Sequence, residues 1–117
     1  MRTIPLIALT LLATTAAATA AEYEIDPHHT YAAFEIGHFG TSTNRAQFEK
    51  TTGRIAFDRA ARTGAVDVRV ATESVHSGSE EFDKHLRSAD LFDSARHPEM
   101  RFVSERFEFD GDRVAKV

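Results

Sequence analysis

Apolar and polar residues alternate along several short segments of this chain. The clearest run is Val66, Val68 and Val70, which alternates with Asp67 and Arg69. A period of two places successive side chains on opposite faces of a strand. Such segments therefore predict a sheet with one apolar face and one polar, solvent-exposed face. Asp110-Gly111 predicts a hairpin turn into a last strand. The other predicted strands lie near residues 31–36, 45–49, 54–58, 100–102 and 106–109.

Short connections join most of the predicted strands. Short turns pair strands antiparallel in chain order, because a parallel crossover needs about a dozen residues or more. We expect one such turn at Thr51-Thr52-Gly53. Only the segment from 72 to 98 is long enough for a different kind of connection.

This long segment contains the one helical signal. Ser77 and Glu80 fit a capping box, and Phe82 and Leu86 lie four residues apart on one face. We therefore expect a helix at about residues 80–87 that packs over the sheet. Two pairs of opposite charge at helical spacing support it: Glu80 with Lys84, and Asp83 with Arg87.

A sheet with one apolar face must cover that face. Closure into a barrel of about eight strands does so and removes the exposed edges. We count about six or seven strands, and the last begins at Arg113 and reaches Val117 with no signal that ends it. The fold class that we expect is mainly β: an antiparallel up-and-down barrel, incomplete in this chain, with one short helix. A small open sandwich is the alternative.

Residues 1–20 have the organisation of an export signal. Arg2 supplies the positive end, residues 4–12 form an apolar core, and Ala18-Thr19-Ala20 offers small residues for cleavage. That core is much shorter than the ~20 residues that span a bilayer. We expect cleavage near Ala20, a periplasmic or secreted location, and a single domain over residues 21–117.

Charge and motif content exclude several classes of function. The formal net charge is -4 with no basic run, so nucleic acid is not expected as a partner. The chain lacks a Gly-x-Ser-x-Gly elbow and a phosphate-binding glycine loop, so we do not expect an enzyme. The absence of cysteine excludes disulfides and thiolate chemistry.

Six histidines raise the hypothesis of a metal site. The candidate ligands show no His-x-x-x-His pair and no repeated ligand motif, so we expect no metal. A periplasmic metal-binding protein stays open as the alternative function. Its ligands would come from His28, His29, His38, His85 and His97 with Asp26, Asp83, Asp90 and Asp93.

Several segments in order carry a resemblance to a known family. They are residues 23–30 (YEIDPHHT), 34–40 (FEIGHFG), 53–58 (GRIAFD) and 83–93 (DKHLRSADLFD), followed by His97-Pro98 and Phe102. The chain resembles the YceI-like family of exported, lipocalin-like, polyisoprenoid-binding proteins. The resemblance implies a lipocalin-like barrel whose tunnel holds an isoprenoid tail, with further strands beyond Val117 in similar members.

Phenylalanine suits the wall of such a tunnel, because it offers a large apolar area and no polar atom that needs a partner. Taken singly, an inward residue more often fills a core, because side chains usually fill the interior of small barrels. We expect the walls to be Phe34, Ile36, Phe48, Ile55, Phe57, Val68 and Phe102, with His29, His38 and Arg87 as candidate headgroup contacts. A structural role is the alternative for part of this set, because His85, Arg87, Asp90 and Asp93 could brace the loop backbone of the segment from 72 to 98. The ligand would be an isoprenoid or another long-chain lipid, such as a quinone or a polyprenyl phosphate, and no cofactor is expected. Transient contact with inner-membrane proteins and a homodimer stay open.

Overall fold

The computed structural model describes residues 20–104 and 106–117. Strands dominate this part of the chain, as the alternation predicts, and one α-helix interrupts them. In chain order the elements are β1 (Ala21–Glu24), β2 (Ala32–His38), β3 (Ser42–Phe48), β4 (Thr51–Asp58), β5 (Thr63–Ala71), the 3-10 turn η1 (Thr72–Ser74), β6 (Val75–His76), α1 (Glu80–Arg87), β7 (Glu99–Val103), β8 (Glu108–Asp110) and β9 (Arg113–Lys116).

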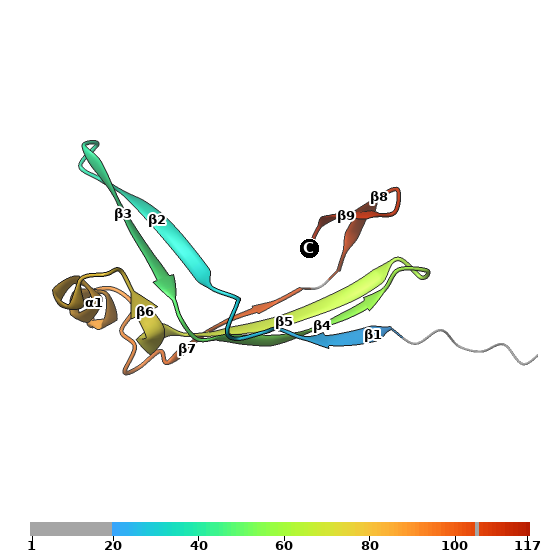
Figure 1. Ribbon diagram of the computed structural model, residues 1–117, viewed down its shortest axis with the longest axis horizontal. Coiled ribbons are helices and arrows are strands. Elements are labelled where there is room, and N and C mark those ends of the chain that lie inside the picture. The colour runs from blue at the N-terminus through green and yellow to red at the C-terminus, as the bar shows by residue number, and fades with distance from the viewer. Residues whose placement is uncertain (1–19, 105) are drawn as a thin grey trace, which may run out of the picture.

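The strands form three antiparallel sheets. Their orders are β1-β4-β5-β7, β2-β3-β6 and the hairpin β8-β9. Figure 1 shows the β2–β3 hairpin and the four-stranded sheet as two arms that diverge from a bend, with α1 beside β6. Over residues 20–104 and 106–117 these sheets do not close into a barrel, so the mainly β, incomplete antiparallel architecture is confirmed.

The bend lies at residues 49–50, and the turn that we expected at Thr51–Gly53 is wrong. Thr51 pairs with Val70 and Gly53 pairs with Val68, so both lie inside β4. Across the bend the chains stay bonded, because Glu49 N donates to Ser74 O and Ala71 N donates to Lys50 O, both at 3.0 Å. β3 and β4 therefore run as one bent strand along β5 and β6.

β1 and β2 run along the other side of this bent strand. β1 pairs with β4, and β2 pairs with β3. Because β7 then pairs with β5, the long segments follow one another in chain order. The antiparallel pairing expected from short connections is confirmed.

Gly53 permits the close approach of β4 and β5. A Cβ atom at this position would lie 2.4 Å from the carbonyl oxygen of Asp67 and 3.0 Å from Cα of Val68. Both neighbours are backbone atoms, which have no freedom to move aside. The position requires glycine for packing, not for a turn.

The register gives the four-stranded sheet one apolar and one charged face. Ile55 lies opposite Val66, and Val68 lies opposite Phe102, on the apolar face. On the charged face, Arg101 donates from Nε and Nη2 to the two carboxylate oxygens of Asp67, both at 2.7 Å. This hydrogen bonding lowers the pKa of Asp67 and raises that of Arg101.

The core lies at the bend, where the apolar sides of both arms meet α1. Its buried members come from β3, β5, β6 and α1, and half-buried side chains surround them. The buried set is Ala46, Phe48, Val70, Val75 and Leu86, and the half-buried set is Ala32, Phe34, Val68, Phe82 and Phe92.

The helix occupies residues 80–87, as expected, but its N-cap is Ser79 and the predicted capping box is wrong. The Ser79 hydroxyl accepts a hydrogen bond from Phe82 N at 3.3 Å. Gly78, with φ of 88°, turns the chain so that Ser79 precedes the first helical turn. The residues described in the structure include no helix long and apolar enough to cross a membrane.

The β8–β9 hairpin turns at Gly111, which has φ of 60°, as Asp110-Gly111 predicted. Figure 1 shows this hairpin above β4 and β5. Two aromatic rings, Phe107 just before β8 and Phe109 within it, pack on Phe57 of the four-stranded sheet. Phe57 lies 6.0 Å from Phe107 and 6.1 Å from Phe109 between ring centroids. The hairpin thus covers one end of the apolar face.

Candidate ligand-binding groove

An apolar groove of about 630 Å³ lies between the β2–β3 arm and α1 with the loop that follows it. Volumes of roughly 300–1,000 Å³ are typical of sites for small molecules. Apolar side chains predominate in the lining, and a few polar groups accompany them. The lining residues are Phe34, Ile36, Gly37, His38, Asn44, Phe82, His85, Leu86, Asp90, Leu91 and Phe92.

Three phenylalanine rings pack together at this groove, two in its lining and one behind them. The ring centroid of Phe34 lies 5.9 Å from that of Phe48 and 5.7 Å from that of Phe92. Phe48 and Phe92 meet edge to face at 5.2 Å. Because Phe48 is only 4% exposed, it supports the two lining rings from behind.

Backbone hydrogen bonds fix the loop that carries Leu91 and Phe92. Phe92 N donates to Leu86 O at 2.9 Å, and Asp93 N donates to Ser88 O at 2.9 Å. Asp93 itself has φ of 46°, which turns the chain back toward the helix. The loop therefore closes against the end of α1, and this places the ring of Phe92 against Phe34 and Phe48.

A buried carboxylate attaches the first turn of α1 to β6. Asp83, which is 5% exposed, accepts hydrogen bonds from Ser77 N at 2.7 Å and from Ser77 Oγ at 2.5 Å. His76 Nδ1 lies 3.1 Å from the other carboxylate oxygen. Burial raises the pKa of Asp83, but the hydrogen bonds from Ser77 and His76 outweigh it, so the pKa falls below its usual range.

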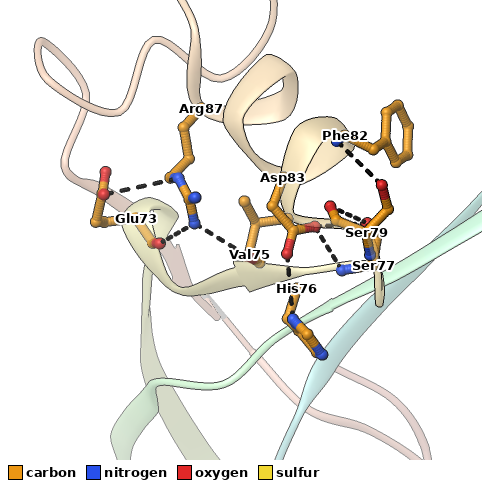
Figure 2. A network of polar contacts seen from close by, with 8 residues as sticks. All are labelled: Glu73, Val75, His76, Ser77, Ser79, Phe82, Asp83 and Arg87. Carbon is orange, nitrogen blue, oxygen red and sulfur yellow. Dashed lines mark hydrogen bonds and ion pairs between the residues drawn. The ribbon is translucent and has the colours of Figure 1, made fainter.

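A second set of contacts attaches the last turn of α1. Arg87 Nη1 donates to the carbonyl oxygens of Glu73 and Val75, both at 3.4 Å, and Arg87 Nε lies 3.7 Å from the Glu73 carboxylate. Figure 2 shows the contacts at the two ends of the helix side by side. Asp83 and Arg87 were predicted to pair with each other along the helix. Each has partners outside the helix instead: Asp83 bonds Ser77, and Arg87 bonds the carbonyl oxygens of Glu73 and Val75. We call these contacts of Asp83 and Arg87 the polar clamp.

Comparison with known proteins decides the family. The sequence profile of the YceI-like domain matches residues 23–117. This chain belongs to the YceI-like family. A UPF0312 protein from Pectobacterium atrosepticum is 37% identical over 112 residues, which cover 93% of this chain and 58% of the relative. Protein YceI from Salmonella arizonae is 37% identical over 107 residues, which cover 89% of this chain and 56% of the relative. The chain spans somewhat more than half the length of these curated relatives.

Of the residues predicted to form the tunnel of this YceI-like domain, Phe34 and Ile36 line the groove. Phe48 lies behind them in the core. The other four lie on the apolar face of the four-stranded sheet and are not part of the groove lining: Ile55, Phe57, Val68 and Phe102. The predicted walls therefore divide between the groove and the neighbouring sheet face.

Of the three predicted headgroup contacts, only His38 lines the groove. Arg87 is part of the polar clamp. His29 is exposed in the loop before β2, where its Nδ1 lies 2.6 Å from Asp26, and this contact lowers the pKa of Asp26.

Eight of the eleven lining residues were not predicted as a ligand wall or headgroup contact. Phe82 and Leu86 were predicted to pack in the helix, and Leu91 and Phe92 entered only through the resemblance. The polar members were placed in the metal hypothesis or left out: His85, Asp90 and Asn44. The signal for Leu91 and Phe92 was their position four and five residues after the end of an amphipathic helix. In the residues that the structure describes, no group of three or more His, Asp or Glu side chains could hold a metal ion.

Proposed function

We propose that this YceI-like protein binds a polyisoprenoid or a similar long-chain amphipathic lipid and carries it through an aqueous compartment. The apolar groove beside α1 is the observation that carries the proposal. A prenyl chain has almost nothing to hydrogen-bond, so its site requires apolar walls and length. Side chains such as Phe34, Leu91 and Phe92 supply such walls.

The free energy of binding would come from hiding apolar surface. Each Å² removed from water contributes about 25 cal/mol, and ordering of the flexible tail opposes this gain. Leu91 is 51% exposed and Ile36 is 56% exposed, so both retain surface that a ligand can cover. Phe102 is 51% exposed on the adjacent sheet face, which would extend the apolar path for a long tail.

The polar side chains of the groove would contact the headgroup. His38, Asn44, His85 and Asp90 offer hydrogen-bond donors and acceptors, and the lining contains no Lys or Arg. We assign the headgroup to these polar groove side chains instead of to His29 or Arg87, whose side chains have other partners. Export through the predicted signal at residues 1–20 belongs to the same proposal, as does the absence of catalysis.

Organic extraction of the purified protein followed by mass spectrometry tests this function. We expect a long-chain lipid to co-purify in a stoichiometric amount. Metal analysis of the same sample tests the alternative, which no observation in the described residues favours. Stoichiometric metal without lipid would contradict the carrier function.

A pair of variants tests the site. Leu91→Asp places a charge in the groove at a position that is already 51% exposed, so the fold should tolerate it. Val103→Asp is the matched control, because Val103 is 52% exposed and does not line this groove. We expect Leu91→Asp to weaken binding of a fluorescent prenyl lipid by about tenfold or more, the equivalent of ~1.4 kcal/mol. Equal affinities of the two variants would place the ligand elsewhere.

A further inference from the structure

The tip of the β2–β3 hairpin differs from the rest of the chain in charge. Residues 36–44 contain no Asp, Glu, Lys or Arg, although 27% of all residues are of these types. The tip carries Phe39, which is 90% exposed and is the most exposed large apolar side chain in the described residues. A phenylalanine ring held almost wholly in water gains free energy when it is transferred to an apolar environment.

The turn itself presents this ring outward. Phe39 and Gly40 have φ of 50° and 71°, and Thr41 donates from its backbone N to His38 O at 3.1 Å. The Thr41 hydroxyl donates to the same oxygen at 3.2 Å. A positive φ is unfavourable for phenylalanine, so the closed turn imposes this conformation. Among the described residues, the ring of Phe39 has one aromatic contact, with His38 at 4.5 Å between centroids.

The nearest charges on the hairpin are paired with each other. Arg45 Nε lies 2.6 Å from Glu35 Oε1 across the two strands. From this pair to Phe39 the chain advances four positions, or about 13 Å at ~3.3 Å per residue. Elements that lie in the membrane interface enter it by about 5–10 Å. The uncharged tip is therefore long enough to enter the interface while the Glu35–Arg45 pair stays in water.

The tip also adjoins the groove. Ile36, His38 and Asn44 belong to both the uncharged tip and the groove lining. A membrane that receives the tip would therefore meet one end of the groove. Leu91, from the opposite wall, is 51% exposed at the same groove.

We propose that the β2–β3 tip is a membrane-docking element that inserts Phe39 into the interface of a phospholipid bilayer. The use of this contact, to pass a lipid between bilayer and groove, rests on the proposed function, but the insertion does not. A second copy of the chain fits the tip less well, because a stable interface buries about 800 Å² per partner and one phenylalanine supplies roughly 150–250 Å². Insertion into a bilayer requires only that the ring leave water.

A single tryptophan makes the insertion visible, because the chain contains none. In Phe39→Trp, titrated with phosphatidylcholine vesicles, we expect a blue shift of emission and quenching by brominated lipid. Tyr31→Trp is the matched control, because Tyr31 is 50% exposed and lies at the other end of the same hairpin. Zwitterionic vesicles are required, since the net charge of -4 would oppose binding to anionic ones.

The comparison between tryptophan at position 39 and tryptophan at position 31 decides the result. It does so even where another segment, such as residues 1–20, binds the vesicles. A shift at position 39 without a shift at position 31 supports docking by the tip. No shift at position 39, or equal shifts at both positions, overturns the proposal. A shift without vesicles that grows with protein concentration also overturns it, in favour of self-association. Phe39→Ser should lower vesicle partitioning by about tenfold with unchanged circular dichroism. Retained docking with no bound lipid would contradict only the carrier function.

Discussion

The polar clamp of α1 predicts a large effect for one buried carboxylate. Asp83→Ala removes the acceptor of the hydrogen bonds from Ser77 N and Ser77 Oγ and the partner of His76 Nδ1. The helix would then keep its apolar contact through Leu86 and its clamp at Arg87. We expect the first turn of α1 to loosen and the groove wall that it carries to shift.

The magnitude follows from what each partner of Asp83 does after the change. His76 is half exposed and bonds water instead, and the Ser77 hydroxyl retains Ser79 O as a partner at 3.3 Å. The Ser77 N–H loses its acceptor, and an unsatisfied buried donor costs about 1–3 kcal/mol. Removal of the buried charge offsets part of this, since desolvation opposes ionisation there. We expect a loss of about 2 kcal/mol for Asp83→Ala and about 1 kcal/mol for Asp83→Asn, whose amide oxygen still accepts.

Urea unfolding by circular dichroism gives these free energies, and amide hydrogen exchange locates the change. Glu81→Ala is the matched control, because it removes an exposed carboxylate from the same helical turn. This control should cost less than about 0.5 kcal/mol. Equal losses in Asp83→Ala and Glu81→Ala, or unchanged exchange in α1, would refute the clamp.

Three further predictions concern pH, backbone packing and surface charge. The pKa of Asp83 is lowered by folding, so its contribution is present above pH ~4 and is lost on acidification, and Asp83→Asn should flatten the fall in stability below that pH. Gly53→Ala should destabilise by about 1–3 kcal/mol in urea, since its Cβ meets backbone atoms of β5. Arg101→Ala should raise the pKa of Asp67 in a carboxyl NMR titration, with little loss of stability at high salt.

Much of the fold could be predicted because its signals are local. The alternation around Val68 fixes which side chains share a face, and the spacing of Phe82 and Leu86 fixes the helix. The bend at residues 49–50 was missed, because Thr51-Thr52-Gly53 has the composition of a turn although it lies within strand β4. Only the partner strand, whose backbone approaches position 53, distinguishes them.

The groove could be predicted only in part, because it joins segments that are distant in sequence. The alternation placed Phe34 and Ile36 on an apolar face, but it could not show that the loop after α1 lies against this face. The structure bears out the prediction that Arg87 braces the segment from 72 to 98, but the sequence could not name its partners. Its partners are backbone carbonyl oxygens, and their positions depend on the tertiary fold and not on the residue types nearby.

Attachment of α1 by polar contacts has a consequence for ligand binding. A helix held only by apolar packing would use its apolar face for that purpose and would have little left to offer a lipid. Here the contacts of Asp83 and Arg87 anchor both ends of the helix, and Leu86 is its one buried apolar residue. Phe82 stays half buried at the groove and can contact a ligand. The clamp therefore separates stability from binding, so groove substitutions such as Leu91→Asp should change affinity much more than the free energy of unfolding.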